Sequence, residues 1–268
     1  MMIKLIAIDM DGTALNSNHE FSPRLFHLLK KAIQQGVHVI PATGRTLTTI
    51  PREVFRIPGI RYVISSNGAD IMDLYTKKSI KKELLPGKEA LAVLERLKRF
   101  PIICYIHSEG RQYQSKDSIE FRLKHDPHFK SFLTPNLIDN LGDFILTHPD
   151  EIEKVGGICY DEEIFQAILQ EEKKFGHINM ASTGKLSIEF NSPHASKGNA
   201  LDYLCSILKI PSSQVMALGD NQNDLSMFQF AGHAVAMGNA IDELKELADE
   251  ITLSCDEDGA AIAIEKIL

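Results

Sequence analysis

The stretch IAIDMDGTALN, residues 6–16, begins as an apolar strand and ends with two carboxylates. Its apolar residues lead directly to Asp9 and Asp11, which precede a Gly-Thr turn. Two carboxylates this close repel each other, so one pKa rises unless a cation compensates. The stretch therefore predicts a strand that delivers a cation-binding pair of carboxylates to its end.

A second acidic cluster lies far along the chain, in LGDNQNDL, and again follows an apolar strand. Asp220, Asn223 and Asp224 offer its oxygen atoms. Mg²⁺ prefers hard oxygen ligands and accepts a few carboxylates together with water and phosphate oxygens. Two acidic strand ends that meet at one place predict a Mg²⁺ site more strongly than either does alone.

Apolar strands alternate with helices at both ends of the chain. Strands are predicted at IKLIAID, VHVIPATGR and YVISSNGA, with one helix after Ser22-Pro23 and another from about Thr46 to Phe55. The alternation resumes from Ser196, through the strands VMALGD and HAVAMG, to a last helix from about Gly259. This order indicates an α/β fold with a doubly wound parallel sheet, which binds ligands at the carboxyl ends of its strands.

The middle of the chain has a different pattern. Antiparallel strands around a Lys-rich turn are predicted in ADIMDLYTKKSIKKELL, and mixed helices and strands follow. We expect a discontinuous catalytic core of residues 1–84 and 191–268, with an inserted α+β cap domain of residues 85–190. Three histidines of the insert, His107, His125 and His128, are expected to be solvated and not to bind metal.

Composition excludes several classes of protein. The chain has 268 residues, 44% of them hydrophobic, and a formal net charge of −7, which argues against general nucleic-acid binding. Its four cysteines lack the close spacing of a zinc or redox pair, so we expect buried free thiols and a reducing cytoplasm. No apolar stretch approaches the ~20 residues that span a bilayer, and the N-terminal apolar run ends at Asp9, unlike a signal peptide.

Positive charge and backbone donors complete the predicted site. Lys197 begins a helix after a polar loop, and Thr43-Gly44-Arg45 brings a hydroxyl and N–H groups to a predicted helix start. A carboxylate nucleophile, Mg²⁺, a hydroxyl and a lysine are the parts needed for phosphoryl transfer to an aspartate. The sequence leaves two roles open for Arg45, a salt bridge or a substrate contact, and Asn67 before Gly68 is typical of a turn.

Four segments, in order, resemble the motifs of the haloacid dehalogenase superfamily. They are DMDGT at 9–13, ATGR at 42–45, SKG at 196–198 and GDNQND at 219–224. SSNGA at 65–69, AVAMGNA at 234–240 and the long insertion resemble, more narrowly, the Cof-type sugar-phosphate phosphatases. The chain departs from the pattern at Ala14, where leucine is more usual, and at His194, where glycine is common.

The resemblance implies a role for each motif. Asp9 would be the nucleophile, and Asp11 the general acid and base. Mg²⁺ would be held by Asp9, the Asp11 backbone carbonyl and Asp220, while Asp224 would support the metal or orient Lys197. The residues implied to bind phosphate or substrate are Met10 through its backbone, Thr43, Gly44, Arg45, Asn67, Lys197 and Asn223. The inserted domain would be a cap that closes over the site and selects the leaving group.

The predicted function is that of a Mg²⁺-dependent phosphatase, a phosphoric monoester hydrolase, acting on a small phosphorylated metabolite through an aspartyl-phosphate. Asp11 favours phosphate esters over carbon–halogen bonds, because an alcohol leaving group needs a proton and chloride does not. A phosphomutase with the same intermediate and a non-catalytic regulator that binds a phosphometabolite are the alternatives. No nucleic-acid or membrane partner is expected, and the chain is expected to be a monomer or homodimer.

Overall fold

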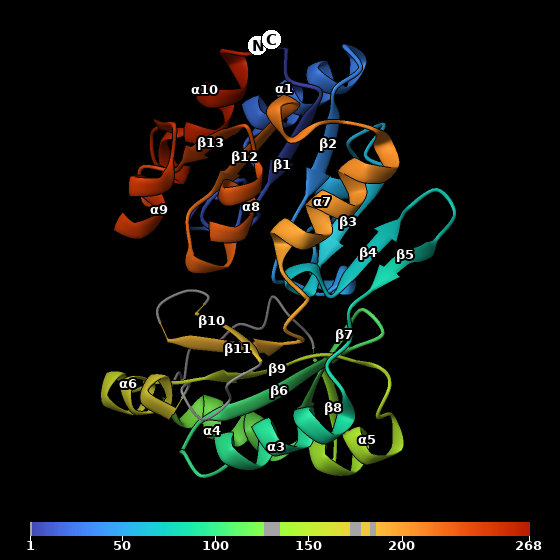
Figure 1. Ribbon diagram of the computed structural model, residues 1–268. Helices are drawn as coiled ribbons and strands as arrows, with labels where there is room; N and C mark the ends of the chain where they lie inside the picture. Colours follow the sequence, from blue (N-terminus) through green and yellow to red (C-terminus); the bar gives the residue numbers. More distant parts are fainter. Residues whose placement is uncertain (1, 126–134, 172–177, 183–185) are drawn as a thin grey trace. The chain divides into compact units, whose positions relative to one another are not determined.

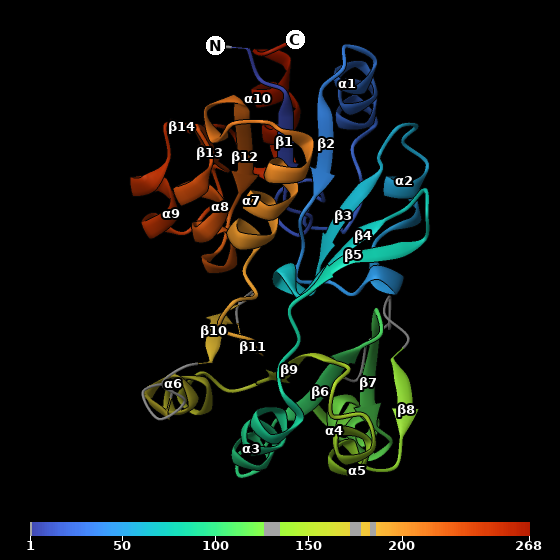
Figure 2. The same cartoon turned by 45° about the vertical axis from the view of Figure 1, so that its right-hand side comes forward.

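The computed structural model describes residues 2–125, 135–171, 178–182 and 186–268 (Figures 1 and 2). The chain divides into two compact units. Unit 1 comprises Met1–Arg45, Ile50–Lys82 and Ser196–Leu268, and unit 2 comprises Thr46–Thr49 and Glu83–Ala195. In this division Thr46–Thr49 belongs to unit 2, although the segment lies between two parts of unit 1 in the sequence.

Unit 1 is built on a five-stranded sheet in the order β14-β13-β12-β1-β2, and all its neighbours pair in parallel. Figure 1 shows α7 and α8 in front of this sheet and α1 behind it. The predicted doubly wound parallel sheet is therefore confirmed. Its elements are β1 (Leu5–Ile8), α1 (Pro23–Gln34), β2 (His38–Pro41), α7 (Lys197–Leu208), β12 (Val215–Gly219), α8 (Leu225–Phe230), β13 (His233–Ala236), α9 (Asp242–Leu247), β14 (Glu250–Ile251) and α10 (Gly259–Glu265).

A small antiparallel sheet continues unit 1 beyond β2. It consists of β3 (Tyr62–Ser65), β4 (Asp70–Asp73) and β5 (Lys78–Lys82), so the expected antiparallel strands around the Lys-rich turn are confirmed. An isolated parallel bridge between Ala42 and Ile64 joins β3 to the end of β2. This bridge brings the loop after β3 to the carboxyl edge of the parallel sheet.

The continuous helix expected from Thr46 to Phe55 is wrong. The structure has a 3₁₀ turn at Leu47–Thr49 and a short helix α2 at Arg52–Phe55. Pro51 separates the two, because it has no N–H to donate and disfavours the helical conformation of the residue before it. The first helix is confirmed, since the Ser22 hydroxyl accepts a hydrogen bond from the N–H of Leu25 and Pro23 begins α1.

Unit 2 contains a six-stranded sheet in the order β10-β11-β9-β6-β7-β8, in which only β7 and β8 run parallel. Its apolar core includes Leu94, Ile106, Ile145, Val155 and Ile168, contributed by helices α3, α5 and α6 and by strands β6 and β9. The elements are α3 (Gly87–Leu97), β6 (Ile103–Ser108), β7 (Arg111–Ser115), α4 (Asp117–His125), β8 (Asn136–Ile138), α5 (Leu141–Thr147), β9 (Ile152–Ile158), α6 (Glu162–Glu171), β10 (Asn179–Ser182) and β11 (Ser187–Asn191).

One expectation about the insert's histidines is wrong. His107 is buried, with 3% of its surface exposed, because it lies on a central strand of the sheet. Burial and the neighbouring Lys154 hold the pKa of His107 well below its ordinary value, so the ring is neutral. His125 is exposed as expected, and His128 lies outside the described residues.

All four cysteines carry free thiols, and Cys104, Cys159 and Cys205 are buried, as the sequence indicated. Within the part of the chain that the structure describes, no helix combines the length and the apolar character that a bilayer crossing requires.

Candidate active site

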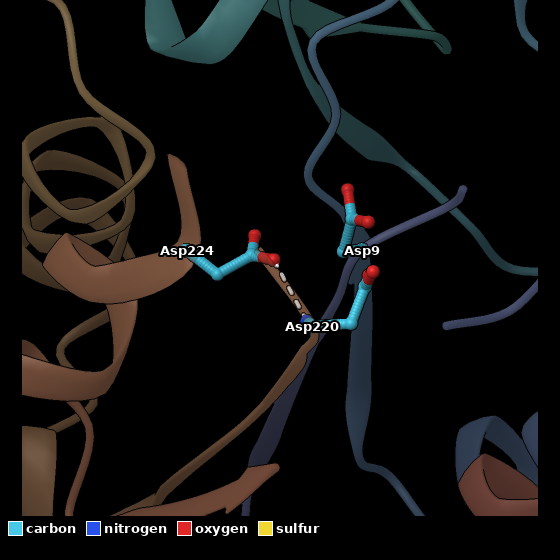
Figure 3. Close-up of side chains that lie close together, drawn as sticks. All are labelled: Asp9, Asp220 and Asp224. Atoms are coloured by element: carbon cyan, nitrogen blue, oxygen red, sulfur yellow. Dashed lines mark hydrogen bonds between the residues drawn. The ribbon is translucent and has the colours of Figure 1, made fainter. Parts of the chain in front are cut away.

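Two neighbouring parallel strands bring the separated acidic motifs together. Ile8 at the end of β1 pairs with Leu218 of β12, and the N–H of Asp9 donates to the Leu218 carbonyl at 3.1 Å. Asp9 and Asp220 therefore follow their strands at the same edge of the sheet, and Asp224 lies in the 3₁₀ turn after β12. One carboxylate oxygen from each of the three lies within 4.8 Å of the others (Figure 3).

Lys197 is the cation that this cluster encloses. Its side chain is fully buried, and its Nζ donates to Oδ1 of Asp9 and to Oδ1 of Asp224, each at 2.6 Å. The two carboxylates outweigh the effect of burial and raise the pKa of Lys197 above its ordinary value, so the amine is charged. The charge of Lys197 thus lies among three carboxyl groups.

The start of α7 fixes the position of Lys197. Ser196 caps this helix, with its hydroxyl accepting from the N–H of Asn199 at 3.1 Å. The N–H of Gly198 donates to Oγ of Ser226 at 3.0 Å, and a Cβ at Gly198 would lie 2.2 Å from the Ser226 carbonyl oxygen. Only glycine allows α7 and α8 to approach this closely. The glycine of the SKG motif therefore allows Lys197 to be buried at the start of α7.

The electrostatics of the cluster favour a further cation. Burial raises the pKa of Asp9 well above its ordinary value, despite Lys197, and the charges of Asp224 and Asp220 act in the same direction. Burial and the charge of Asp224 raise the pKa of Asp220 to about 7. These carboxyl groups are short of positive charge, and their donor atoms are the hard oxygens that suit Mg²⁺. The residues present therefore fit the predicted metal.

Asp11 has a different environment from Asp9. Its carboxylate receives two hydrogen bonds from Arg45, at 2.7 Å from Nε and 2.5 Å from Nη2, and Nδ1 of His19 lies 3.4 Å away. Burial alone would raise the pKa of Asp11, but the bonds and charge of Arg45 prevail and lower it. Of the two roles left open for Arg45, the structure shows the salt bridge.

The loops after β2 and β3 form the other side of the site. Oγ1 of Thr43, which is 1% exposed, accepts from the N–H of Arg45 at 3.1 Å, and Gly44 between them is half-buried. The N–H of Asn67 donates to the Thr43 carbonyl at 3.0 Å. Oδ1 of Asn67 accepts from Nδ2 of Asn223 at 3.1 Å. Residues from three separate motifs are thereby linked.

The turn after Asp9 contains Met10, whose backbone the family resemblance assigns to phosphate, and two residues without an assigned role, Gly12 and Thr13. Met10 is buried, and its carbonyl accepts from the N–H of Leu15 at 2.8 Å, which closes the turn. Oγ1 of Thr13 donates to Oδ1 of Asp220 at 2.9 Å and so orients a predicted metal ligand. Gly12 has φ +79°, and a Cβ there would lie 2.4 Å from the Asp220 carboxylate. The Gly-Thr pair that follows the two aspartates is the sequence signal that could have identified Gly12 and Thr13 as site residues.

Known proteins are similar to this chain along nearly its whole length. A family model described as haloacid dehalogenase-like hydrolase matches residues 6–264. Phosphatase YwpJ of Bacillus subtilis is 32% identical over 290 residues, which cover 99% of this chain and 100% of that protein. The 5-amino-6-(5-phospho-D-ribitylamino)uracil phosphatase YcsE of the same organism is 33% identical over 263 residues, with coverage of 98% and 94%.

A solved structure agrees with these relatives. A haloacid dehalogenase-like hydrolase from B. subtilis superimposes with a TM-score of 0.86 at 30% identity, covering 99% of this chain and 100% of that one. The match of the family model extends over the core and the insert alike. The chain belongs to the haloacid dehalogenase-like hydrolase family.

Proposed function

We propose that the chain is a Mg²⁺-dependent phosphatase that hydrolyses a small phosphorylated metabolite, such as a sugar phosphate, through an aspartyl-phosphate on Asp9. Full-length relatives of this chain are named phosphatases, so its class is phosphoric monoester hydrolase. The observation that carries the finer proposal is the convergence of Asp9, Asp220 and Asp224 beside a single buried lysine.

The residues that would hold Mg²⁺ are Asp9, the backbone carbonyl of Asp11, and Asp220, with Asp224 in support. When bound, the ion supplies positive charge that neutralises the carboxylates and the phosphoryl oxygens. The fit rests on the three converging oxygens and on the raised pKa values of Asp9 and Asp220.

The chain's own groups account for both halves of the reaction. An Asp9 oxygen attacks phosphorus, the ester P–O bond breaks, and Asp11 gives its proton to the departing alcohol. Asp11 then takes a proton from water, whose oxygen attacks the same phosphorus and releases Asp9. The first half thus begins with Asp11 protonated, and the second half begins with it ionised. The structure shows the form for the second half, because Arg45 pairs with the Asp11 carboxylate and lowers its pKa.

Phosphate is held by groups that surround Asp9. Lys197 bridges Asp9 and Asp224, so its charge is fixed beside the attacking oxygen. We assign phosphate contacts to Lys197, Thr43, Gly44, Asn223 and the backbone of Met10. Arg45 and Asn67 are proposed to contact substrate from the loops after β2 and β3, and the inserted domain to act as the cap that selects the leaving group.

Phosphate release from p-nitrophenyl phosphate tests the mechanism. With Mg²⁺, the wild-type chain should turn over and Asp9→Asn should not, because the amide cannot form the phosphoryl bond. Retained turnover in that variant would overturn the mechanism. A screen of phosphorylated metabolites then identifies the substrate class. Isomerised product without free phosphate would indicate a mutase, and ligand binding without turnover a regulator.

Location and oligomeric state complete the proposal. The four free thiols suit the reducing cytoplasm that we propose as the location. Sedimentation velocity of the full chain distinguishes the monomer from the homodimer.

A further inference from the structure

The stretch AVAMGNA, residues 234–240, is a motif of the sequence that the proposed function leaves without a role. Its first three residues end β13, and the others belong to the loop that leads to α9. This loop, the turn that contains Gly12 and the end of β12 all belong to unit 1, so their contacts lie within one compact unit.

The backbone of this loop is fixed beside Asp220. The N–H of Ile241 donates to the carbonyl of Asp220 at 3.0 Å. On the other side, the N–H of Gly238 donates to the carbonyl of Leu253 at 3.0 Å. The loop is therefore held between the end of β12 and the segment that follows β14.

The side chain of Asn239 joins two further segments. Its Nδ2 donates to the carbonyl of Gly12 at 2.9 Å, and its Oδ1 accepts from the N–H of Cys255 at 2.9 Å. Cys255 begins the 3₁₀ turn Cys255–Glu257. Asn239 is exposed, but both ends of its amide are engaged by the backbone. The amide thus connects the turn after Asp9 to the C-terminal part of unit 1.

Asn239 holds a peptide bond whose orientation the local sequence leaves open. Gly12 has φ +79°, and glycine places few steric limits on the peptide that follows it. The N–H of that peptide, which belongs to Thr13, donates to the carbonyl of Met10 at 3.4 Å, a long hydrogen bond. The shorter bond from Asn239 therefore selects one orientation of the Gly12–Thr13 peptide.

This peptide lies between two groups of the proposed metal site. The backbone carbonyl of Asp11 precedes it, and Thr13, which donates from Oγ1 to Oδ1 of Asp220 at 2.9 Å, follows it. The same loop thus acts on both acidic motifs, because Ile241 fixes the backbone of Asp220 and Asn239 fixes the turn after Asp11. Mg²⁺ demands near-ideal octahedral geometry, so small displacements of its ligands lower its affinity.

We propose that Asn239 is a positioning residue for the Mg²⁺ site. By fixing the Gly12–Thr13 peptide, it sets the Asp11 carbonyl and the Thr13 hydroxyl relative to Asp220. The role requires no contact between Asn239 and the metal or the phosphate. This inference rests on the proposed function, because it requires Mg²⁺ to bind at the strand ends.

Two cations test the proposal. Mg²⁺ demands a fixed geometry, whereas Ca²⁺ accepts flexible arrangements of oxygen ligands. Loss of positioning should therefore weaken Mg²⁺ binding more than Ca²⁺ binding, whereas a general loss of folded protein would weaken both alike. Calorimetric titration of the full chain at pH 8 with MgCl₂ and with CaCl₂ gives the two dissociation constants.

Asn239→Ala should raise the dissociation constant for Mg²⁺ about three- to tenfold, the effect of one net hydrogen bond, and leave that for Ca²⁺ within about twofold. Asp256→Ala is the matched control. Oδ1 of Asp256 accepts from the N–H of Ser17 at 2.8 Å, so this variant removes a bond of the same 3₁₀ turn and spares the Gly12 carbonyl. It should leave the ratio of the two constants within about twofold of the wild-type ratio.

Equal losses of both ions in Asn239→Ala, or unchanged Mg²⁺ binding, would overturn the positioning role. The same change of ratio in Asp256→Ala would overturn it as well, because the effect would then belong to the 3₁₀ turn as a whole. Asn239→Ser, whose side chain is shorter, gives the same comparison if the alanine variant folds poorly.

Asp220→Asn separates this inference from the function beneath it. If the wild type binds no Mg²⁺, or Asp220→Asn binds it as the wild type does, the proposed metal site fails whatever Asn239 does. If Asp220→Asn loses Mg²⁺ and Asn239→Ala leaves the ratio of the two constants unchanged, only the positioning role fails.

Discussion

Binding of Mg²⁺ to this site should release protons and weaken as the pH falls. A carboxylate must be ionised to bind a metal, and the pKa of Asp220 is raised to about 7. Protonation of Asp220 weakens the apparent affinity for Mg²⁺ by a factor of 1 + 10^(pKa − pH). This factor is about 11 at pH 6 and about 1.1 at pH 8. The dissociation constant should therefore rise about tenfold from pH 8 to pH 6. The raised pKa of Asp9 acts in the same direction.

Calorimetric titration of the full chain with MgCl₂ measures both the dissociation constant and the number of protons released. Repeating it in buffers of different ionisation enthalpy counts the protons released. Asp220 alone should release about 0.9 proton per ion at pH 6 and about 0.1 at pH 8. The wild type therefore provides its own control across the pH range.

Variants at Thr13 provide the matched control. Its hydroxyl donates to Asp220 and lowers the pKa of that carboxyl. Thr13→Val should therefore move the midpoint of the pH dependence upward, and Thr13→Ser should leave it near the wild-type value. Equal affinity at pH 6 and pH 8 without proton release would refute the reasoning, as would a midpoint that Thr13→Val leaves unmoved.

Three other outcomes are expected. In EDTA, thermal denaturation should show lower stability at pH 8 than at pH 5. The raised pKa of Asp220 contributes stability that is fully present below the pKa this group has in the unfolded chain, and that is lost as the pH rises through about 7. Saturating Mg²⁺ should reduce this difference. Lys197→Met should abolish phosphate release and lower the metal-free stability by about 3–5 kcal/mol in urea denaturation, because it leaves buried carboxylates unpaired. Gly68→Ala should lower the free energy of unfolding by about 1–3 kcal/mol in urea denaturation, and should also lower kcat. Gly68 has φ +94°, and a Cβ there would lie 2.2 Å from the carbonyl oxygen of Ser196, the residue before Lys197.

The convergence at the strand ends follows from the sequence for a physical reason. Parallel strands place their carboxyl ends at one edge, so Asp9 and Asp220 had to lie close once β1 and β12 were neighbours. Lys197 was readable for a similar reason, since a capping serine placed it in the first turn of a helix. The regular geometry of strands and helices fixes the positions of such residues. The spacing of apolar residues is enough to recognise these strands and helices in the sequence.

Other features depend on contacts that no local pattern encodes. The pairing of Arg45 with Asp11 joins side chains 34 positions apart, and their rotamers decide it. The burial of His107 depends on which strands become central in an antiparallel sheet, an order that alternation alone does not specify. The break at Pro51 is different, because its signal was local and outweighs the helical spacing around it.

The bonds of Asp224 favour one of the two roles that the family resemblance implies for it. Its Oδ1 accepts from Lys197, and its Oδ2 accepts from the N–H groups of Asp220 and Asn221, at 3.0 and 3.1 Å. Both oxygens are thus engaged by donors of the chain, whereas Asp9 gives Lys197 only one oxygen and Asp220 receives Thr13 on one. We infer that Asp224 chiefly orients the lysine and the backbone after β12. The negative charge that a metal must balance is then concentrated on Asp9 and Asp220, the two groups with raised pKa values.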